Sequence, residues 1–87
     1  MVIKMSQKEK LLQRLLQRPK DFEYPEIVKL LRYFGYNEDT TPNGSRVRFI
    51  SKNNSVITFH KPHPQPTLKR YVLDIVIDTL RKDGLIQ

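Results

Sequence analysis

The sequence predicts an α+β domain in which helices cover one face of a three-stranded antiparallel sheet, in the order α-α-β-β-β-α. Two segments in the first 35 residues and one in the last 20 have apolar residues at helical spacing. Between them, apolar and polar residues alternate with a period of two, which is typical of strands with one buried face. The 87 residues suffice for one hydrophobic core and leave no room for two.

The first predicted helix begins at Ser6 and is stopped by Pro19. Ser6 and Glu9 form the S-x-x-E pattern of a capping box, and proline cannot continue a helix. Six of the first twenty residues are basic and one is acidic, so this segment has +5 of the total charge of +7. We therefore treat residues 1–21 as a basic helical extension and residues 22–87 as the domain itself. The apolar stripe of the extension consists of Leu11, Leu12, Leu15 and Leu16.

Two further helices follow from the same spacing. The second begins at Pro25, where a missing N–H has no cost, and ends at Gly35. Thr67 is the predicted N-cap of the last helix, which ends at Gly84, and Leu85 and Ile86 are expected to fold back as a hydrophobic tail. The predicted apolar face of that last helix contains Leu68, Tyr71, Val72, Ile75, Val76, Thr79 and Leu80.

Three strands are predicted between these helices, over residues 36–41, 45–51 and 55–60. Pro42-Asn43-Gly44 is a strong turn signal, and Asn53-Asn54 marks the second turn. The segment 61–66 has proline at every second position, which excludes both helix and central strand.

Strand parity predicts which side chains lie on the open face of the sheet. If the apolar residues of both strands are buried, the opposite face of the sheet carries Arg46, Arg48, Thr58 and His60. Pairing Val47 with Phe59 sets Arg46 directly opposite His60. An exposed arginine on a strand is by itself more often solvated than functional. Together with Lys61 and His63, however, these residues form a cationic patch with no acidic member, and that patch is suited to phosphate.

Lys69 and Arg70 fall in the predicted first turn of the last helix. Exposed cations there oppose the helix dipole at a cost of about 0.3–1 kcal/mol each, which a nearby phosphate would reverse. The alternative is that both cations are merely tolerated. His60 and His63 have H-x-x-H spacing, but no cysteine or carboxylate lies in that loop, so we expect neither a metal site nor a cofactor.

Composition excludes several classes of protein. The chain has no cysteine, which excludes disulfides, thiolate zinc sites and cysteine nucleophiles. Its longest apolar runs are three residues, so we expect no membrane span, no signal peptide and a cytoplasmic location. A net charge of +7 favours an anionic partner.

Several short motifs in a fixed order resemble the HicA family over residues 22–86. They are Tyr24-Pro25-Glu26-Ile27-Val28-Lys29-Leu30-Leu31, Phe34-Gly35-Tyr36, Gly44-Ser45-Arg46-Val47-Arg48-Phe49, Phe59-His60-Lys61-Pro62-His63-Pro64, Leu68-Lys69 and Asp83-Gly84-Leu85-Ile86. The resemblance implies a fold similar to the double-stranded-RNA-binding domain. It further implies a toxin that cleaves mRNA independently of the ribosome and is neutralised by a HicB antitoxin. The N-terminal stripe could then extend the core, mediate dimerisation or dock the antitoxin.

One departure from the family concerns its usual Gly-Ser-His motif, whose histidine is catalytic. The matching position here is Arg46. Arginine stays protonated and cannot act as a general base, but it can bind the scissile phosphate or stabilise developing charge. His60 is the first candidate for proton transfer and His63 the second. The predicted RNA-binding residues are Arg48, Lys61, Lys69 and Arg70.

The replacement of the family's histidine by Arg46 leaves three interpretations of the function open. The first is an active or attenuated endoribonuclease of the toxin type. The second is a non-catalytic RNA-binding module of the same fold. The third is an interaction protein whose patch fits an acidic antitoxin. Because phosphate contacts make affinity fall steeply with salt, weak salt dependence of RNA binding would favour the third.

Overall fold

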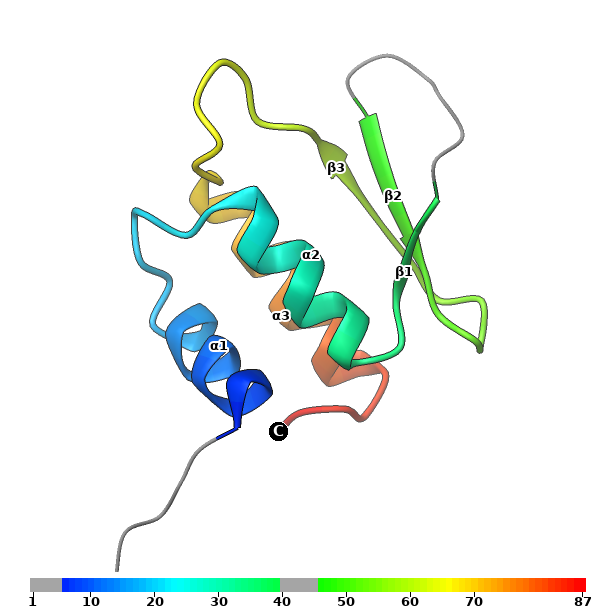
Figure 1. Cartoon of the computed structure of the whole chain (residues 1–87). Coiled ribbons are helices and arrows are strands. Elements are labelled where there is room, and N and C mark those ends of the chain that lie inside the picture. Colours follow the sequence, from blue (N-terminus) through cyan, green and yellow to red (C-terminus); the bar gives the residue numbers. More distant parts are fainter. Residues whose placement is uncertain (1–5, 40–45) are drawn as a thin grey trace, which may run out of the picture.

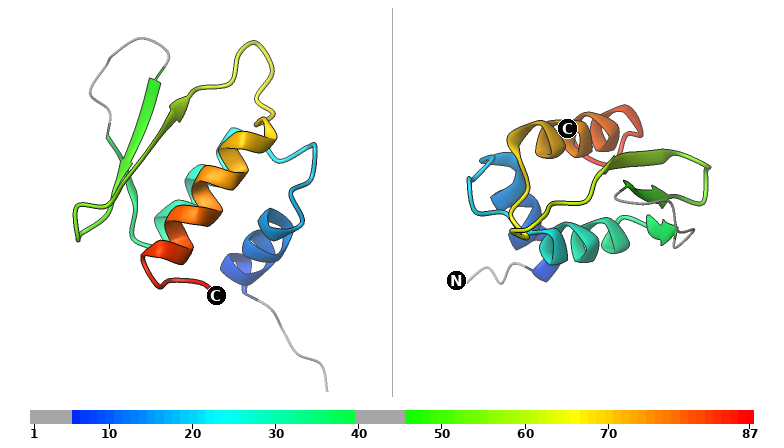
Figure 2. Two further views of the ribbon diagram at one scale, coloured as in Figure 1. Left: turned by 180° about the vertical axis from the view of Figure 1, so that it is seen from behind. Right: turned by 90° about the horizontal axis from the view of Figure 1, so that it is seen from above.

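The computed structural model describes residues 6–39 and 46–87, and this part of the chain has the predicted α+β architecture. Helices α2 and α3 lie side by side on one face of the sheet, and α1 packs on their far side, away from the strands (Figures 1 and 2). The other face of the sheet is left uncovered by helices (Figure 2). The elements in chain order are α1 (Gln7–Leu16), α2 (Tyr24–Tyr33), β1 (Asn37–Asp39), β2 (Arg46–Ile50), β3 (Val56–His60) and α3 (Arg70–Lys82).

The sheet has the strand order β1-β2-β3 and is antiparallel throughout. Its β2–β3 register confirms the prediction, because Val47 lies opposite Phe59 and Arg46 opposite His60. Asn54 has a φ of 63°, in the left-handed region that asparagine tolerates, so the predicted second turn is also confirmed. The predicted turn at Pro42-Asn43-Gly44 lies outside the described residues.

The ends of α1 and α2 follow from local hydrogen bonds. The Ser6 side chain accepts the backbone N–H of Glu9 at 3.2 Å, as the S-x-x-E pattern predicts. Helix α2 starts one residue earlier than predicted, with Glu23 as its N-cap. At its other end Gly35 has a φ of 89°, and the next N–H, that of Tyr36, donates to the carbonyl of Leu31 at 2.8 Å. This is the Schellman arrangement that glycine permits.

The predicted N-cap of α3 at Thr67 is wrong, because Lys69 occupies that position and the helix starts at Arg70. Thr67 instead forms an isolated β-bridge with Glu23. On either side of the bridge, Tyr24 N–H donates to the carbonyl of Pro66 and Leu68 N–H to that of Phe22, both at 2.8 Å. The backbone before α3 is therefore paired with the chain that enters α2, which delays the helix.

The buried face of α3 also differs in part from the predicted one. Leu68 is buried outside the helix, and Tyr71, predicted on the apolar face, is 48% exposed. The predicted tail is half correct, since Ile86 packs against the core but Leu85 is 43% exposed. The side chains that α3 buries are Val72, Leu73, Val76, Ile77 and Leu80.

Helix α1 contributes to the same core as the rest of the chain. Leu15 is fully buried, and its neighbours Leu11, Leu12 and Leu16 pack against the core. Two ion pairs also join this region to the other helices: Arg14 Nε to Glu26 Oε2 at 2.9 Å, and Arg18 Nε to Asp74 Oδ1 at 2.6 Å. In residues 6–39 and 46–87 no helix has the length and apolar content needed to cross a membrane.

Candidate nucleic-acid interface

The open face of the sheet presents Arg46 beside His60. Arg46 is the first residue of β2 and His60 the last of β3, so the antiparallel pairing sets them directly opposite each other. Both side chains are exposed, whereas Val47 and Phe59, next along each strand, are buried against the helices. A permanent cation and a group able to take up or release a proton thus occupy one accessible edge of the sheet.

Arg48 lies two residues further along β2, and it has an acidic neighbour. Its Nη2 is 3.4 Å from Oδ2 of Asp39, which lies opposite it on β1. Asp39 thus adds an acidic side chain beside the predicted cationic patch. Asp39 offsets part of the positive charge of Arg48.

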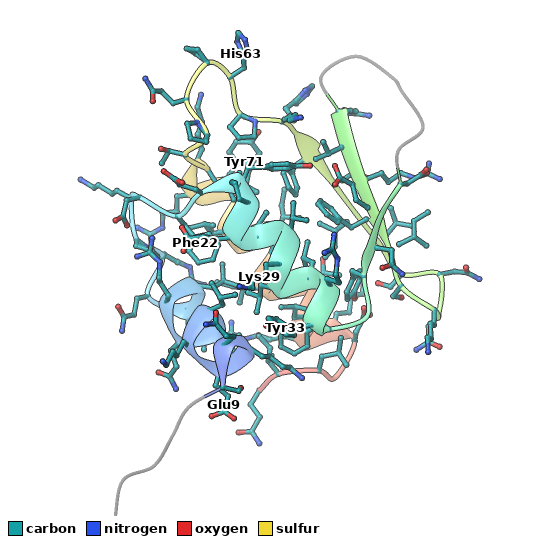
Figure 3. All side chains as sticks on the ribbon, viewed as in Figure 1. Glu9, Phe22, Lys29, Tyr33, His63 and Tyr71 are labelled. Atoms are coloured by element: carbon teal, nitrogen blue, oxygen red, sulfur yellow. The ribbon has the colours of Figure 1, made fainter. Side chains whose placement is uncertain are left out.

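A pocket of about 330 Å³ adjoins this edge and gathers four of the predicted site residues. It lies between the proline-rich loop and the start of α3, and His60, Lys61, His63 and Lys69 are among its lining residues. His63 lies at the outer end of the loop (Figure 3). Arg46 and Arg48 do not line this pocket.

Tyr24 holds Lys61 at the pocket's edge. The Nζ of Lys61 lies 5.3 Å from the centre of the Tyr24 ring, within the range of a cation–π contact. The same ring packs edge-on against Phe59, and its hydroxyl donates to Glu38 Oε2 at 2.5 Å. Burial and this hydrogen bond together raise the pKa of Tyr24 well above its ordinary value. Tyr24 is therefore a neutral, fixed support for Lys61.

A second groove continues the basic surface around the N-terminus of α3. Its volume is about 460 Å³, and the residues lining it include Arg18, Lys20, Lys69 and Arg70. Lys69 borders both pockets and so connects them. Arg70, predicted to bind RNA, borders this groove and not the first pocket.

Sequence reasoning missed three residues at this surface. Asp39 was missed because Asn37-Glu38-Asp39 has no apolar alternation to set its parity. Lys20 was missed because only the folded chain brings it near Arg70. Tyr71, which lines the first pocket, was assigned to the core. The only feature of the sequence that could have indicated its place at this surface was its position directly after Lys69 and Arg70.

The chemistry available here is phosphate binding and proton transfer. Arginine and lysine contribute fixed positive charge, and the two histidines can exchange protons. Among the described residues no group of three or more His, Asp or Glu could hold a metal ion.

Comparison with known proteins identifies the family. Residues 24–85 match the model of the HicA toxin of bacterial toxin–antitoxin systems, a span that contains α2, the whole sheet and α3. No curated protein and no solved structure matches the chain significantly. The family implies a cognate antitoxin as partner. With most of its length matched and with the expected arrangement of helices on one face of an antiparallel sheet, the chain belongs to the HicA toxin family.

Proposed function

We propose that this chain is an RNA-binding toxin that cleaves mRNA without the ribosome, in the cytoplasm where mRNA is found. The observation that supports this most is the pairing of Arg46 with His60 on the exposed sheet face. Beside that pair, Lys61 and Lys69 border a pocket and supply further positive charge for the RNA backbone.

In the proposed reaction, His60 accepts the proton of an RNA 2′-hydroxyl as that oxygen attacks the adjacent phosphorus. The new O2′–P bond forms and the P–O5′ bond breaks, which leaves a 2′,3′-cyclic phosphate and a 5′-hydroxyl. The 5′ oxygen takes its proton from a histidinium, that of His60 or His63. Arg46 binds a non-bridging phosphate oxygen and stabilises the charge that develops there. Attack by water on the same phosphate would use the same two groups.

A HicB-like antitoxin is the proposed partner of this surface. The chain has a net charge of +7, and its cations gather along the open sheet face and the two pockets. An antitoxin with an acidic surface would complement that charge and block access of RNA.

A non-catalytic RNA-binding module is the second candidate function. Arg46 favours it, because arginine cannot do the proton transfer that the family's usual histidine performs at this position. Under this alternative the surface binds RNA through phosphate contacts and leaves the chain intact.

Cleavage of RNA by purified protein, followed on a gel, separates these functions. The variants are His60→Ala, His63→Ala and Arg46→Ala, with Arg32→Ala, an exposed arginine on α2, as the matched control. Loss of cleavage in His60→Ala and Arg46→Ala, with circular dichroism unchanged, supports the proposed site. Full cleavage by His60→Ala removes that residue from the mechanism, and loss of cleavage in His63→Ala would then assign the proton transfer to His63.

RNA binding at increasing salt completes the experiment. If the wild type does not cleave but its salt-dependent RNA binding weakens in Arg46→Ala, the binding module is correct. If RNA binding is weak and insensitive to salt, the patch serves the antitoxin instead.

A further inference from the structure

We infer that the pocket between the proline-rich loop and α3 holds one unpaired nucleotide of the RNA, with its base stacked on Tyr71. This rests on the proposed function, because it requires RNA as the ligand, and it specifies which form of RNA the surface accepts. The phosphates flanking that nucleotide lie beside Lys61 and Lys69, which border the same pocket.

Tyr71 is an aromatic side chain with no polar or aromatic partner in the described part of the chain. It is 48% exposed, and within residues 6–39 and 46–87 neither its ring nor its hydroxyl makes a ring contact, cation–π contact or hydrogen bond. Tyr24, in contrast, packs on Phe59 and donates to Glu38. The ring of Tyr71 is therefore available as a stacking platform at the pocket wall.

The pocket has the composition that a nucleotide requires. Leu68, Val72 and two prolines supply apolar walls, which suit the faces of a base. Lysines and histidines from both sides supply the charge that suits phosphate, and no acidic residue is among the lining. Its volume of about 330 Å³ falls at the small end of the range for ligand pockets.

The pocket favours single-stranded RNA over duplex RNA. A base within a duplex stacks on both of its neighbours, so it must be unstacked before it can lie on Tyr71. Unpaired segments and loops do not have to break pairing to reach that state. Because His60 borders the pocket and faces Arg46, the stacked nucleotide would adjoin the phosphate that these residues act on.

Tyr33 provides a matched control for a Tyr71 variant. It is 44% exposed and lies at the last position of α2, toward the opposite end of the molecule from Tyr71 and His63 (Figure 3). Replacing either tyrosine by alanine removes a similarly exposed ring. Only one of the two rings borders the pocket.

Binding is measured by fluorescence anisotropy with a short single-stranded RNA of mixed sequence and a blunt duplex of the same length. Tyr71→Ala is expected to weaken single-strand binding by about 5- to 150-fold, the effect of losing one stacked base. Tyr71→Phe should retain the affinity because it keeps the ring, and Tyr33→Ala should match the wild type. Duplex binding should change little in all three variants.

Unchanged single-strand binding by Tyr71→Ala overturns the inference, and so does an equal loss for both RNAs. If Tyr71→Ala does not fold, binding of the wild-type protein to an abasic RNA, which lacks its bases, is measured instead. An affinity for abasic RNA equal to that for the normal RNA also overturns the stacking. If cleavage is lost in Arg46→Ala but unaffected in Tyr71→Ala, the inferred stacking is wrong and the proposed function still holds. A wild type that binds no RNA at any salt concentration would overturn both.

Discussion

Asp39 on β1 faces Arg48 on β2 across the open side of the sheet, with Oδ2 and Nη2 3.4 Å apart. More than half of the Arg48 side chain is exposed, so the pair contributes little to folding, on the order of 1 kcal/mol or less. Its larger effect concerns the ligand. It places a negative charge on the sheet face that carries Arg46, Arg48 and His60, close to where RNA is proposed to bind.

Asp39→Asn is expected to strengthen RNA binding by about two- to fivefold at low salt, because it removes one repulsive charge and frees Arg48. Anisotropy across a salt series measures this, and the gain should shrink as salt rises. Asp78→Asn, an exposed change on α3, controls for net charge. An equal gain in both variants would show that position on the sheet face is irrelevant.

Restoring the family's usual motif by Arg46→His is expected to raise RNA cleavage by about tenfold or more. A histidine there adds a group that can transfer protons beside the phosphate, and such catalysis typically contributes factors of 10² or more. Initial cleavage rates on a gel measure the effect. Arg48→His, on the same strand and face, is the control; a similar gain in that variant would contradict a specific role for position 46.

The order of elements and the open-face residues were predictable because the signals are local. The alternation in Arg46–Ile50 and Val56–His60 fixes strand parity, and pairing the inward Val47 with Phe59 across the hairpin then places Arg46 opposite His60. Gly35 and Gly84 mark two helix ends, because glycine tolerates the positive φ that often terminates a helix, and both residues adopt it.

What the sequence did not predict depends on contacts between distant segments. Thr67 has the side chain of a good N-cap, but its backbone pairs with Glu23, and this pairing moves the start of α3. Tyr71, expected in the core, lines the pocket instead, because α3 buries Leu73 and Ile77. Likewise, Lys20 reaches the second groove only through the packing of α1 against the other helices.

Leu15→Ala is expected to lower the free energy of unfolding by about 2–5 kcal/mol, because it empties a fully buried position in the shared core. Leu12→Ala, at a partly buried position on the same helix, should have a smaller effect. Urea unfolding followed by circular dichroism measures both. If Leu15→Ala has no effect, α1 is not part of the cooperative unit, and residues 1–21 are a separable extension.

Glu26→Gln tests the link between α1 and α2. The guanidinium of Arg14 donates to both carboxylate oxygens of Glu26, at 2.9 and 3.2 Å. These hydrogen bonds lower the pKa of Glu26 below its ordinary value of 4.5, despite partial burial that acts in the opposite direction. A carboxyl with a lowered folded-state pKa stabilises the protein above its unfolded pKa, and this stability is lost as pH falls through the folded pKa.

At neutral pH Glu26→Gln is therefore expected to reduce the free energy of unfolding by less than about 1 kcal/mol, because both side chains remain partly exposed to solvent. The difference from wild type should be constant above about pH 4.5 and shrink below it, as pH falls toward the lowered pKa that the Glu26 carboxyl has in the folded protein. Urea titrations from neutral to acid pH measure it, with the exposed change Glu9→Gln as control. Glutamine keeps the size of Glu26 and an oxygen that can accept the Glu23 backbone N–H, so a deficit that persists unchanged at the acid end would mean that the ionised carboxylate is not what stabilises the fold.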